Sequence, residues 1–426
     1  MNPVVKPDVT LSLGLPQVAL AVGGDGRGDE DGPEDRGEAM IKLLMLCAMD
    51  VSSGNLHRAD AYLRQITGLA SVSGDPAQRL AAWFAKALAV RLLKRWPGLH
   101  KAINHYAWSS ELGSSSVPVQ PIFTPCFPFL GLAYRIIVNN LLRVISMETV
   151  VHFVDLGSGD PKLWVPLIRG LAQSGDRPPH VRLTCVCNRK GILEKLGVML
   201  VKEADISDTP FQFRPLRINL GELTADMLDV RSGESLVVVS MLGLHTLLAE
   251  DDRIDAKFSG LCKKDSEVKD CRRLSDFLRI IRSFSPKVFF LVEQEANHNT
   301  ARLIDRFQEG LYYYSKVFDS ISTAFISSHP VPTEEREGLE EMLGQEIEDI
   351  ISCEGLERKE RHERFEKWGV RLTRAGFKIS RLFANSIEDA KVETLGRDGY
   401  TVVSERLCAR ICWDGRPIYA VSTWTC

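Results

Sequence analysis

Asp155, Gly157 and Gly159 are the residues of this 426-residue chain whose types and spacing first suggest chemistry. They follow the apolar segment 150–154, which predicts a buried strand, and they precede a helix that Pro161 opens. In such a strand–loop–helix unit, glycines allow the backbone to approach a nucleotide cofactor at the helix N-terminus. The spacing therefore predicts a loop that can cradle a nucleotide. The alternative is structural, because two glycines also permit a tight turn.

The D-x-G-x-G order resembles the glycine loop of S-adenosylmethionine-dependent methyltransferases. In such sites an acidic residue at the end of the second strand holds the ribose hydroxyls. Here the second predicted strand ends at residues 185–188 without a carboxylate, and Pro161 removes one backbone donor. We therefore expect no cofactor and no catalysis, with Asp155, Gly157 and Gly159 as a vestigial loop. A methyltransferase, or a protein that binds its cofactor, remains the alternative.

Glu293, Glu295 and His298 form a second group of titratable side chains at the end of another predicted strand. Alternating acids on a strand share one face, so the two carboxylates could act together in acid–base chemistry. A hydrogen-bond network of the following loop is the explanation that we prefer. The ten cysteines include no C-x-x-C pair, so we expect buried thiols and no metal site.

The apolar pattern of the segments that must position these groups changes from helical spacing to alternating strands and helices near residue 150. Residues 39–147 carry apolar side chains at helical spacing and predict a helical cap, in which Asp75 can cap a helix that begins at Pro76. Residues 148–426 alternate apolar strands with helices, which predicts a parallel sheet with a helical insertion and C-terminal antiparallel strands. Residues 1–38, rich in glycine and acids, predict a disordered tail.

Charge and hydropathy argue against several classes of protein. Lys and Arg number 53 and Asp and Glu 56, and the resulting formal charge of -3 argues against a nucleic-acid coat protein. A local basic pair, Arg272 and Arg273, could still contact DNA, although such pairs usually lie on solvated faces. No apolar run reaches the roughly 18 residues of a membrane span, and the N-terminal residues do not resemble a secretory signal.

Three leucine patterns suggest contacts with other proteins. An L-x-L-x-L segment in the tail is similar to the short repression motif with which plant regulators dock a co-repressor. An L-x-x-L-L pattern after a central strand would gather one apolar face on a helix, and two further leucines lie on stripes of the cap. Each pattern has an alternative explanation. The L-x-L-x-L segment could arise by chance, the L-x-x-L-L helix could belong to the core, and the leucines of the cap could pack against the cap itself. The leucines concerned are Leu11, Leu13, Leu15, Leu44, Leu63, Leu244, Leu247 and Leu248.

Several long blocks, taken in order, resemble the GRAS family of plant transcriptional regulators. Residues 41–93 are similar to its first leucine-rich region, 151–155 to its VHIID block and 192–230 to its second leucine-rich region, and later segments are similar to its PFYRE and SAW regions. Residues 94–99 and 411–419 look most like the third SCARECROW-like subgroup. The positions that match family motifs are Val151, His152, Asp155, Pro286, Tyr313, Trp368, Trp413 and Trp424.

The resemblance implies both a fold and a function. The implied fold is α/β, with a Rossmann-like core of methyltransferase type and an N-terminal helical cap. The implied function is non-enzymatic transcriptional coregulation in the nucleus, by protein–protein interaction, in gibberellin signalling and root development. Implied partners are other GRAS proteins and zinc-finger DNA-binding transcription factors, so DNA contact is mainly indirect, and a homodimer is compatible with the chain. A transcription factor that binds DNA directly is a further alternative.

Overall fold

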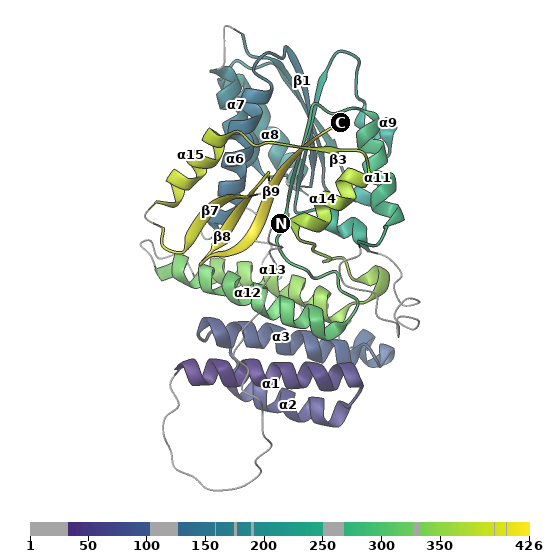
Figure 1. The fold of residues 1–426 in the computed structure, drawn as a ribbon, viewed down its shortest axis with the longest axis vertical. Helices are drawn as coiled ribbons and strands as arrows, with labels where there is room; N and C mark the ends of the chain where they lie inside the picture. Colours follow the sequence, from purple (N-terminus) through teal and green to yellow (C-terminus); the bar gives the residue numbers. More distant parts are fainter. Residues whose placement is uncertain are drawn as a thin grey trace, which may run out of the picture.

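A helical part and a sheet-containing part stack along the long axis of the molecule (Figure 1). Within the residues that the structure describes, no helix is long and apolar enough to cross a membrane. This computed structural model describes residues 33–102, 127–157, 159–173, 177–188, 191–249, 268–326, 333–395, 397–405 and 407–426.

The sheet follows the order β3-β2-β1-β4-β5-β9-β8-β7, and β6 pairs with β9. Strands β1 to β5 pair in parallel, whereas β6 to β9 join in antiparallel fashion. The chain reverses its direction of progress between β1 and β4, the point at which open α/β sheets bind ligands. This architecture confirms the predicted fold class. The strands are β1 Val150–Leu156, β2 His180–Val186, β3 Phe211–Leu216, β4 Ser235–Met241, β5 Val288–Gln294, β6 Lys378–Ser380, β7 Tyr400–Glu405, β8 Cys408–Trp413 and β9 Arg416–Thr425.

Each face of the sheet has its own set of helices, because alternate strand residues point to opposite sides. Val151 and Phe153 of β1 belong to the core formed with α6, α7, α8 and α15. Val154 and Leu156 belong to a second core, formed with η2, α11 and α14. The bounds are α6 Pro128–Val144, α7 Pro161–Ala172, α8 Ile192–Ile206, η1 Leu220–Glu222, α9 Ala225–Leu228, η2 Leu244–Leu248, α11 Arg272–Ser283, η3 Gly355–Glu357, α14 Phe365–Arg374 and α15 Ala384–Thr394.

The cap combines the N-terminal helices with two helices from the middle of the chain. Helices α1 Pro33–Ser53, α2 Leu56–Leu69 and α3 Pro76–Leu93 pack against one another and onto α12 Leu303–Ile326 and α13 Thr333–Ser352 (Figure 1). Asp75 accepts a hydrogen bond from Gln78 N at 2.9 Å, and the Gln78 side chain bonds back to Asp75 N, which forms a capping box. Helix α1 begins at Pro33, inside the segment expected to be a tail.

A buried ion pair fixes α3 to α13. Arg79 Nε lies 2.9 Å from Glu340 Oε1, and both side chains are at most 4% exposed. Arg79 Nη2 also donates to Ser322 Oγ on α12 at 2.7 Å. The ring of Trp83 packs so closely on Gly344 that a Cβ there would overlap it. The N-terminal helices therefore dock on α12 and α13 through a buried ion pair and through a contact at Gly344 that leaves no room for a larger side chain.

Helix α6 lies apart from the other helices of the predicted 39–147 cap. It packs on α7 and α15 beside the sheet, and Asn140 Oδ1 on α6 accepts a hydrogen bond from Phe383 N at 2.8 Å. An apolar stripe shows that a helix packs on something but does not reveal which partner it packs on. The structure thus divides residues 39–147 between the cap and the face of the sheet.

Candidate functional site

The predicted glycine loop lies at the carboxyl end of β1, beside the point where the strand order reverses. Asp155 is fully buried, and its Oδ2 accepts hydrogen bonds from Gly159 N at 3.1 Å and from Trp164 Nε1 at 2.8 Å. The thiol of Cys185 on β2 lies 3.6 Å from the same oxygen. These partners belong to the loop, to α7 and to β2. The carboxylate therefore organises its own turn.

Both glycines of the loop adopt backbone conformations that other residues rarely reach. The φ angles are 109° at Gly157 and 52° at Gly159. A Cβ at Gly159 would lie 3.2 Å from Cγ2 of Ile192, at the start of α8. The glycines are thus required by the turn and by close packing against α8, as the structural alternative held.

The N-terminus of α7 already carries a carboxylate from the chain itself. Asp160 is 2% exposed and caps the helix, accepting hydrogen bonds from Lys162 N at 2.9 Å and from Tyr134 OH at 2.8 Å. Burial, together with the nearby Asp160 carboxylate, raises the pKa of Tyr134 well above its usual value, so the hydroxyl stays protonated. Because a helix N-terminus stabilises negative charge, Asp160 supplies here what an anionic ligand supplies in a nucleotide site.

The end of β2 lacks the acid that a cofactor ribose would need. Asn188 stands there, and its Nδ2 donates to Asn219 Oδ1 at 2.8 Å. The preceding Cys187 is 6% exposed and packs in the core. The described part of the loop therefore has the shape of a nucleotide-binding turn, while its polar groups bond to the protein itself.

A second polar group lies at the carboxyl ends of β4 and β5. His245 stands between two carboxylates, with Nδ1 2.7 Å from Glu293 Oε2 and Nε2 2.9 Å from Glu360 Oε2. Glu293 Oε1 also accepts from the backbone N–H groups of Leu244 and His245, at 2.9 and 3.3 Å. Burial alone would lower the pKa of His245, but the two carboxylates raise it well above its usual value, so the ring is a cation at neutral pH.

Two further histidines extend this group. His362 Nδ1 lies 2.9 Å from His298 Nδ1, and His362 Nε2 lies 3.2 Å from Glu360 Oε2. Burial and neighbouring positive charge lower the pKa of both rings, so both are neutral near pH 7. The ring of His298 stacks on Tyr314 at a centroid distance of 5.7 Å. We call His245, Glu293, His298, Glu360 and His362 the histidine–glutamate cluster.

Glu293 and Glu295, which the sequence suggested as a joint acid–base pair, have separate partners. Glu295 Oε2 accepts a hydrogen bond from Phe365 N at 3.0 Å, and Oε1 lies 3.4 Å from Arg410 Nη2. Burial raises the pKa of Glu295 to about 7. Each carboxylate thus fastens a different segment to the end of β5, which fits the preferred interpretation of a hydrogen-bond network.

Sequence reasoning missed His245, Glu360 and His362. Within the expected helical insertion, the sequence predicts one helix over residues 358–375, whereas α14 begins only at Phe365. The preceding segment is held by buried guanidinium groups: Arg358 Nη1 donates to the carbonyl of His298 at 3.1 Å, and Arg361 Nη2 donates to that of Gly355 at 2.8 Å. Residues 358–364 are all charged or histidine. Such a run has no apolar face, and this was the available signal against an amphipathic helix.

The predicted partner-binding leucines need correction. Leu11, Leu13 and Leu15 lie outside the described residues. Leu44 is 1% exposed, and Leu63 packs against the same core of the cap. The L-x-x-L-L segment forms the 3₁₀ helix η2 instead of the expected α-helix, and Leu244, Leu247 and Leu248 are at most 3% exposed. A partner could reach these three leucines only by unfolding η2, so the core interpretation holds for them.

Helix α8 exposes apolar side chains that sequence reasoning did not single out. One side of the helix packs Leu193, Leu196, Leu200 and Ala204 into the core. The exposed residues are Val198, Met199, Val201 and Ile206, at 72%, 48%, 44% and 71%. A surface helix that is apolar on more than one side indicates a second contact. We call these four residues the α8 patch.

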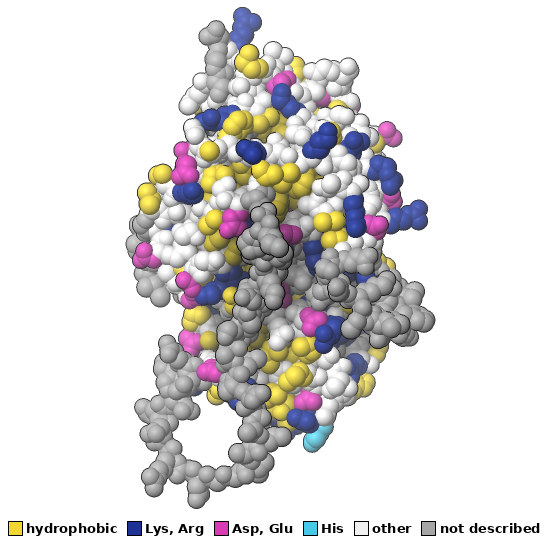
Figure 2. All heavy atoms as spheres, in the orientation of Figure 1, with side chains coloured by type: hydrophobic (Ala, Val, Ile, Leu, Met, Phe, Trp, Pro, Cys, Tyr) yellow, Lys and Arg dark blue, Asp and Glu magenta, His cyan; other side chains and the backbone are white. Residues whose placement is uncertain are grey.

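The basic pair proposed for DNA contact begins helix α11. Arg272 and Arg273 are exposed. Arg272 Nε lies 3.7 Å from Asp276 Oδ2, and the same carboxylate pairs with Arg279 Nη1 at 2.8 Å. Figure 2 shows basic side chains along the side of the molecule where α11 lies, with acidic side chains among them. Interspersed acids weaken the attraction of such a surface for phosphate.

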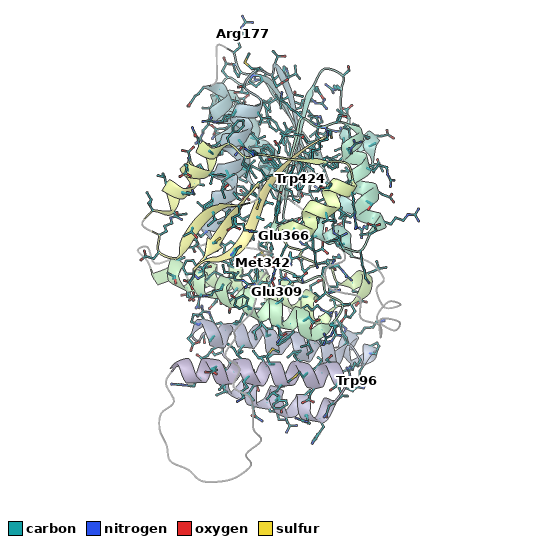
Figure 3. The ribbon with its side chains drawn as sticks, in the orientation of Figure 1. Trp96, Arg177, Glu309, Met342, Glu366 and Trp424 are labelled. Carbon is teal, nitrogen blue, oxygen red and sulfur yellow. The ribbon has the colours of Figure 1, made fainter. Side chains whose placement is uncertain are left out.

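The residues at family-motif positions are buried, and several tie strands to helices. Tyr313 OH donates to the carbonyl of Ile418 at 3.0 Å, and Trp413 Nε1 donates to Asp319 Oδ2 at 2.8 Å. Figure 3 shows Trp424 within the sheet-containing part, whereas Trp96 lies at the end of the cap. The buried set is Val151, His152, Asp155, Pro286, Tyr313, Trp368, Trp413 and Trp424.

Comparison with known proteins establishes the class. The model of the GRAS domain family matches residues 40–425, so the chain belongs to this family. Among its relatives, Scarecrow-like protein 3 of Arabidopsis thaliana is 37% identical, over 92% of this chain and 90% of the relative. DELLA protein RGL1 of the same plant is 32% identical, over 92% of this chain and 70% of the relative.

A solved structure agrees with this assignment. The crystal structure of SCL7 in Oryza sativa superposes with a TM-score of 0.71 at 25% identity, covering 90% of this chain and 99% of that one. SCARECROW-like and DELLA proteins are transcriptional regulators in gibberellin signalling. The chain is accordingly a transcriptional regulator of the GRAS family, which confirms the resemblance seen in the sequence.

Proposed function

We propose that this regulator works through protein contacts alone, without catalysis. The proposal depends on one observation, which is that the acidic groups of the glycine loop bond to the protein itself. Asp155 accepts hydrogen bonds from Gly159 and Trp164, and Asp160 caps α7. The proposed setting is the nucleus, in gibberellin signalling and root development. The proposed partners are other GRAS proteins and zinc-finger DNA-binding transcription factors, through which DNA is contacted mainly indirectly.

Calorimetry tests the absence of catalysis. The full-length protein is titrated with S-adenosylmethionine and, separately, with S-adenosylhomocysteine. We expect no saturable heat for either compound at millimolar concentration, because the polar groups of the loop are already paired with protein atoms. Saturable binding together with transfer of a methyl group to any protein or nucleic acid would overturn the proposal and favour the methyltransferase alternative.

The α8 patch is the surface that we assign to another GRAS protein. Val198 and Ile206 are the most exposed apolar residues of α8, and Lys195 and Asp205, near the two ends of the helix, are also exposed. Burial of apolar area stabilises association by about 25 cal/mol per Å². The charged flanks would set the orientation of an apposed helix. The patch therefore suits a helix that carries both apolar and charged residues.

A paired substitution tests this surface. Val198→Ser with Ile206→Ser should weaken binding to a second GRAS protein at least tenfold, about 1.4 kcal/mol, while the unfolding transition stays close to that of the wild type. Val392→Ser is the matched control, because Val392 is 64% exposed on α15, away from α8. Equal affinity of the double variant and the wild type in analytical ultracentrifugation would remove the α8 patch from the proposal.

Two further partners have their own tests. A triple Leu11, Leu13 and Leu15 to serine variant should lose binding to a co-repressor while it keeps binding to other GRAS proteins. In a gel shift at physiological salt, the protein alone should show weak DNA binding without sequence preference, and a zinc-finger partner should supply specificity. Tight specific binding by the protein alone that Arg272→Ala with Arg273→Ala abolishes would instead establish direct DNA recognition.

A further inference from the structure

Three atoms of the histidine–glutamate cluster converge at ligand spacing for a metal ion. His245 Nε2, Glu360 Oε2 and His362 Nε2 lie within 4.8 Å of one another. Glu360 Oε2 is 2.9 Å from the first nitrogen and 3.2 Å from the second. Ligand atoms at bond lengths of about 2.0–2.2 Å around a tetrahedral zinc ion stand roughly 3.3–3.6 Å apart. Small side-chain movements would therefore place all three atoms on one ion.

The second nitrogen of each histidine is already engaged, as it is in most metal sites. His245 Nδ1 lies 2.7 Å from Glu293 Oε2, which is the carboxylate–histidine arrangement that orients zinc ligands. His362 Nδ1 lies 2.9 Å from His298 Nδ1, so one of these two nitrogens donates to the other. Both rings consequently direct Nε2 towards Glu360.

His362 gives an independent indication of a missing partner. Its ring is fully buried, and Nε2 has no hydrogen-bond partner among the described residues, although Glu360 Oε2 lies 3.2 Å away. If His362 Nδ1 donates to His298, then Nε2 presents a lone pair to a carboxylate. Two acceptors that face each other in the interior are costly. A cation between them removes this cost.

The position in the fold and the ligand types favour zinc. Two imidazoles and one carboxylate form a known zinc ligand set, and the ends of β4 and β5 lie at the sheet edge where ligands bind. The Glu360 side chain is 23% exposed, whereas both rings are at most 4% exposed. An ion would therefore enter from the side of Glu360. The sequence showed no such site, because its three ligands do not follow the spacing of cysteine motifs.

We propose that His245, Glu360 and His362 bind one zinc ion, which clamps residues 358–364 to the carboxyl ends of β4 and β5. The ion takes the place of the proton that His245 holds on Nε2 towards Glu360, while the Nδ1 proton stays in the hydrogen bond to Glu293, so binding releases one proton. It also balances the buried charge of Glu293 and Glu360. The role is structural, and the ion holds the segment that leads into α14.

The wild-type protein provides the first test. Full-length protein is treated with a chelator, dialysed and titrated with ZnCl₂, and bound metal is counted by mass spectrometry. We expect one zinc ion per chain, a higher midpoint of thermal unfolding, and proton release that appears as a heat dependent on the buffer. Replacement by Co²⁺ should give the visible absorption of a tetrahedral site. Absence of a stoichiometric ion and of this absorption would show that protons alone hold the cluster.

Variants then locate the ion. His362→Gln and Glu360→Gln should each weaken zinc binding at least tenfold, and Glu293→Gln should weaken it ten- to hundredfold by releasing His245. His152→Gln is the matched control, because His152 is a fully buried histidine on β1 that bonds to Thr184 at 2.8 Å, outside the cluster. If the control loses zinc as the ligand variants do, or if the ligand variants retain it, the assignment is wrong.

Discussion

Two sites along the same edge of the sheet, the glycine loop and the histidine–glutamate cluster, stabilise buried charges in different ways. At the end of β1, Asp155 bonds to groups four and nine residues further along the chain. At the ends of β4 and β5, His245 bonds to Glu293 and Glu360, which are 48 and 115 residues away. The first site bonds mainly within one strand–loop–helix unit, with Cys185 of β2 beside it. The second exists only when the complete fold brings three segments together.

The comparison bears on how this regulator relates to ligand-binding α/β proteins. Open sheets of this kind bind small molecules at the carboxyl ends of their strands. Here the end of β1 is closed by its own hydrogen bonds, and the ends of β4 and β5 are covered by residues 358–364. In the function proposed above, these positions serve internal cohesion, and the outer surface makes the contacts with partners.

The sharpest test of the comparison removes a carboxylate from the distant cluster. Glu293→Ala leaves the His245 cation and two backbone N–H groups without their main acceptor. We expect a loss of about 3–5 kcal/mol in the free energy of unfolding, measured with urea. Glu366→Ala is the control, since its carboxylate is 49% exposed in a pair with Arg410 and should cost about 0–1 kcal/mol. Equal small losses would show that the cluster does not hold the fold.

The dependence of stability on pH should separate the glycine loop from Glu295, the buried carboxylate just after β5. Burial raises the pKa of Glu295 from 4.5 to about 7, so between these values the native state holds a proton that the unfolded state releases. Stability contributed by this group is therefore complete below pH 4.5 and falls as the pH rises to 7, by a few kcal/mol at about 1.4 kcal/mol per pKa unit. Glu295→Gln should flatten this slope, and Trp164→Phe on α7, beside the glycine loop, should leave it intact. An identical slope in Glu295→Gln would assign the titration to other groups.

A smaller loss is expected at the end of β1. Asp155→Ala leaves Gly159 N and Trp164 Nε1 unbonded in the interior and should cost about 1–3 kcal/mol in urea unfolding. Trp164→Phe removes one donor and keeps most of the ring, so its cost should be lower. Binding to other GRAS proteins should stay unchanged in both. A specific loss of partner affinity without a loss of stability would mean that the loop contributes to the surface that contacts the partner.

The smallest expected effect concerns the turn itself. Gly159→Ala must hold a φ of 52° and places a Cβ 3.2 Å from Ile192 Cγ2, so it should destabilise the protein by about 1–2 kcal/mol. Gly68→Ala on α2 is the control, because no atom lies within 4 Å of its added Cβ. That helical position should gain about 0.5–1 kcal/mol. A neutral Gly159→Ala would show that the turn tolerates other residues.

The glycine loop, whose contacts are mostly between neighbours in the chain, was predictable from the sequence. The apolar run before Asp155, the two glycines and Pro161 predicted β1, its turn and α7, because these signals act between neighbours in the chain. The alternation that follows predicted the parallel sheet. The absence of an acid after β2 was equally visible, because it depends only on which residues follow the strand.

The histidine–glutamate cluster, whose members lie far apart in the chain, was not predictable from the sequence. Glu360 and His362 stand in a charged segment whose partners, His245 and His298, lie in other loops, and nothing in the spacing links them. The leucines of η2 likewise form a pattern typical of exposed helices, yet a position after a central strand buries them. Helix α6 has an apolar stripe that fits the cap and the sheet equally well. In each case the missing information is the identity of the packing partner.

The place of β9 has a consequence for synthesis on the ribosome. Residues Arg416–Thr425 form the strand between β5 and β8, so the sheet stays open along its middle until they emerge. The edge of β5, complete at residue 294, must therefore stay unpaired until the last residues are synthesised, and β8 adds a second open edge just before them. Such unpaired edges are sites of aggregation. A premature stop codon before Arg416 would leave those edges permanently exposed, so late truncations should behave as complete loss-of-function alleles and depend on chaperones for removal.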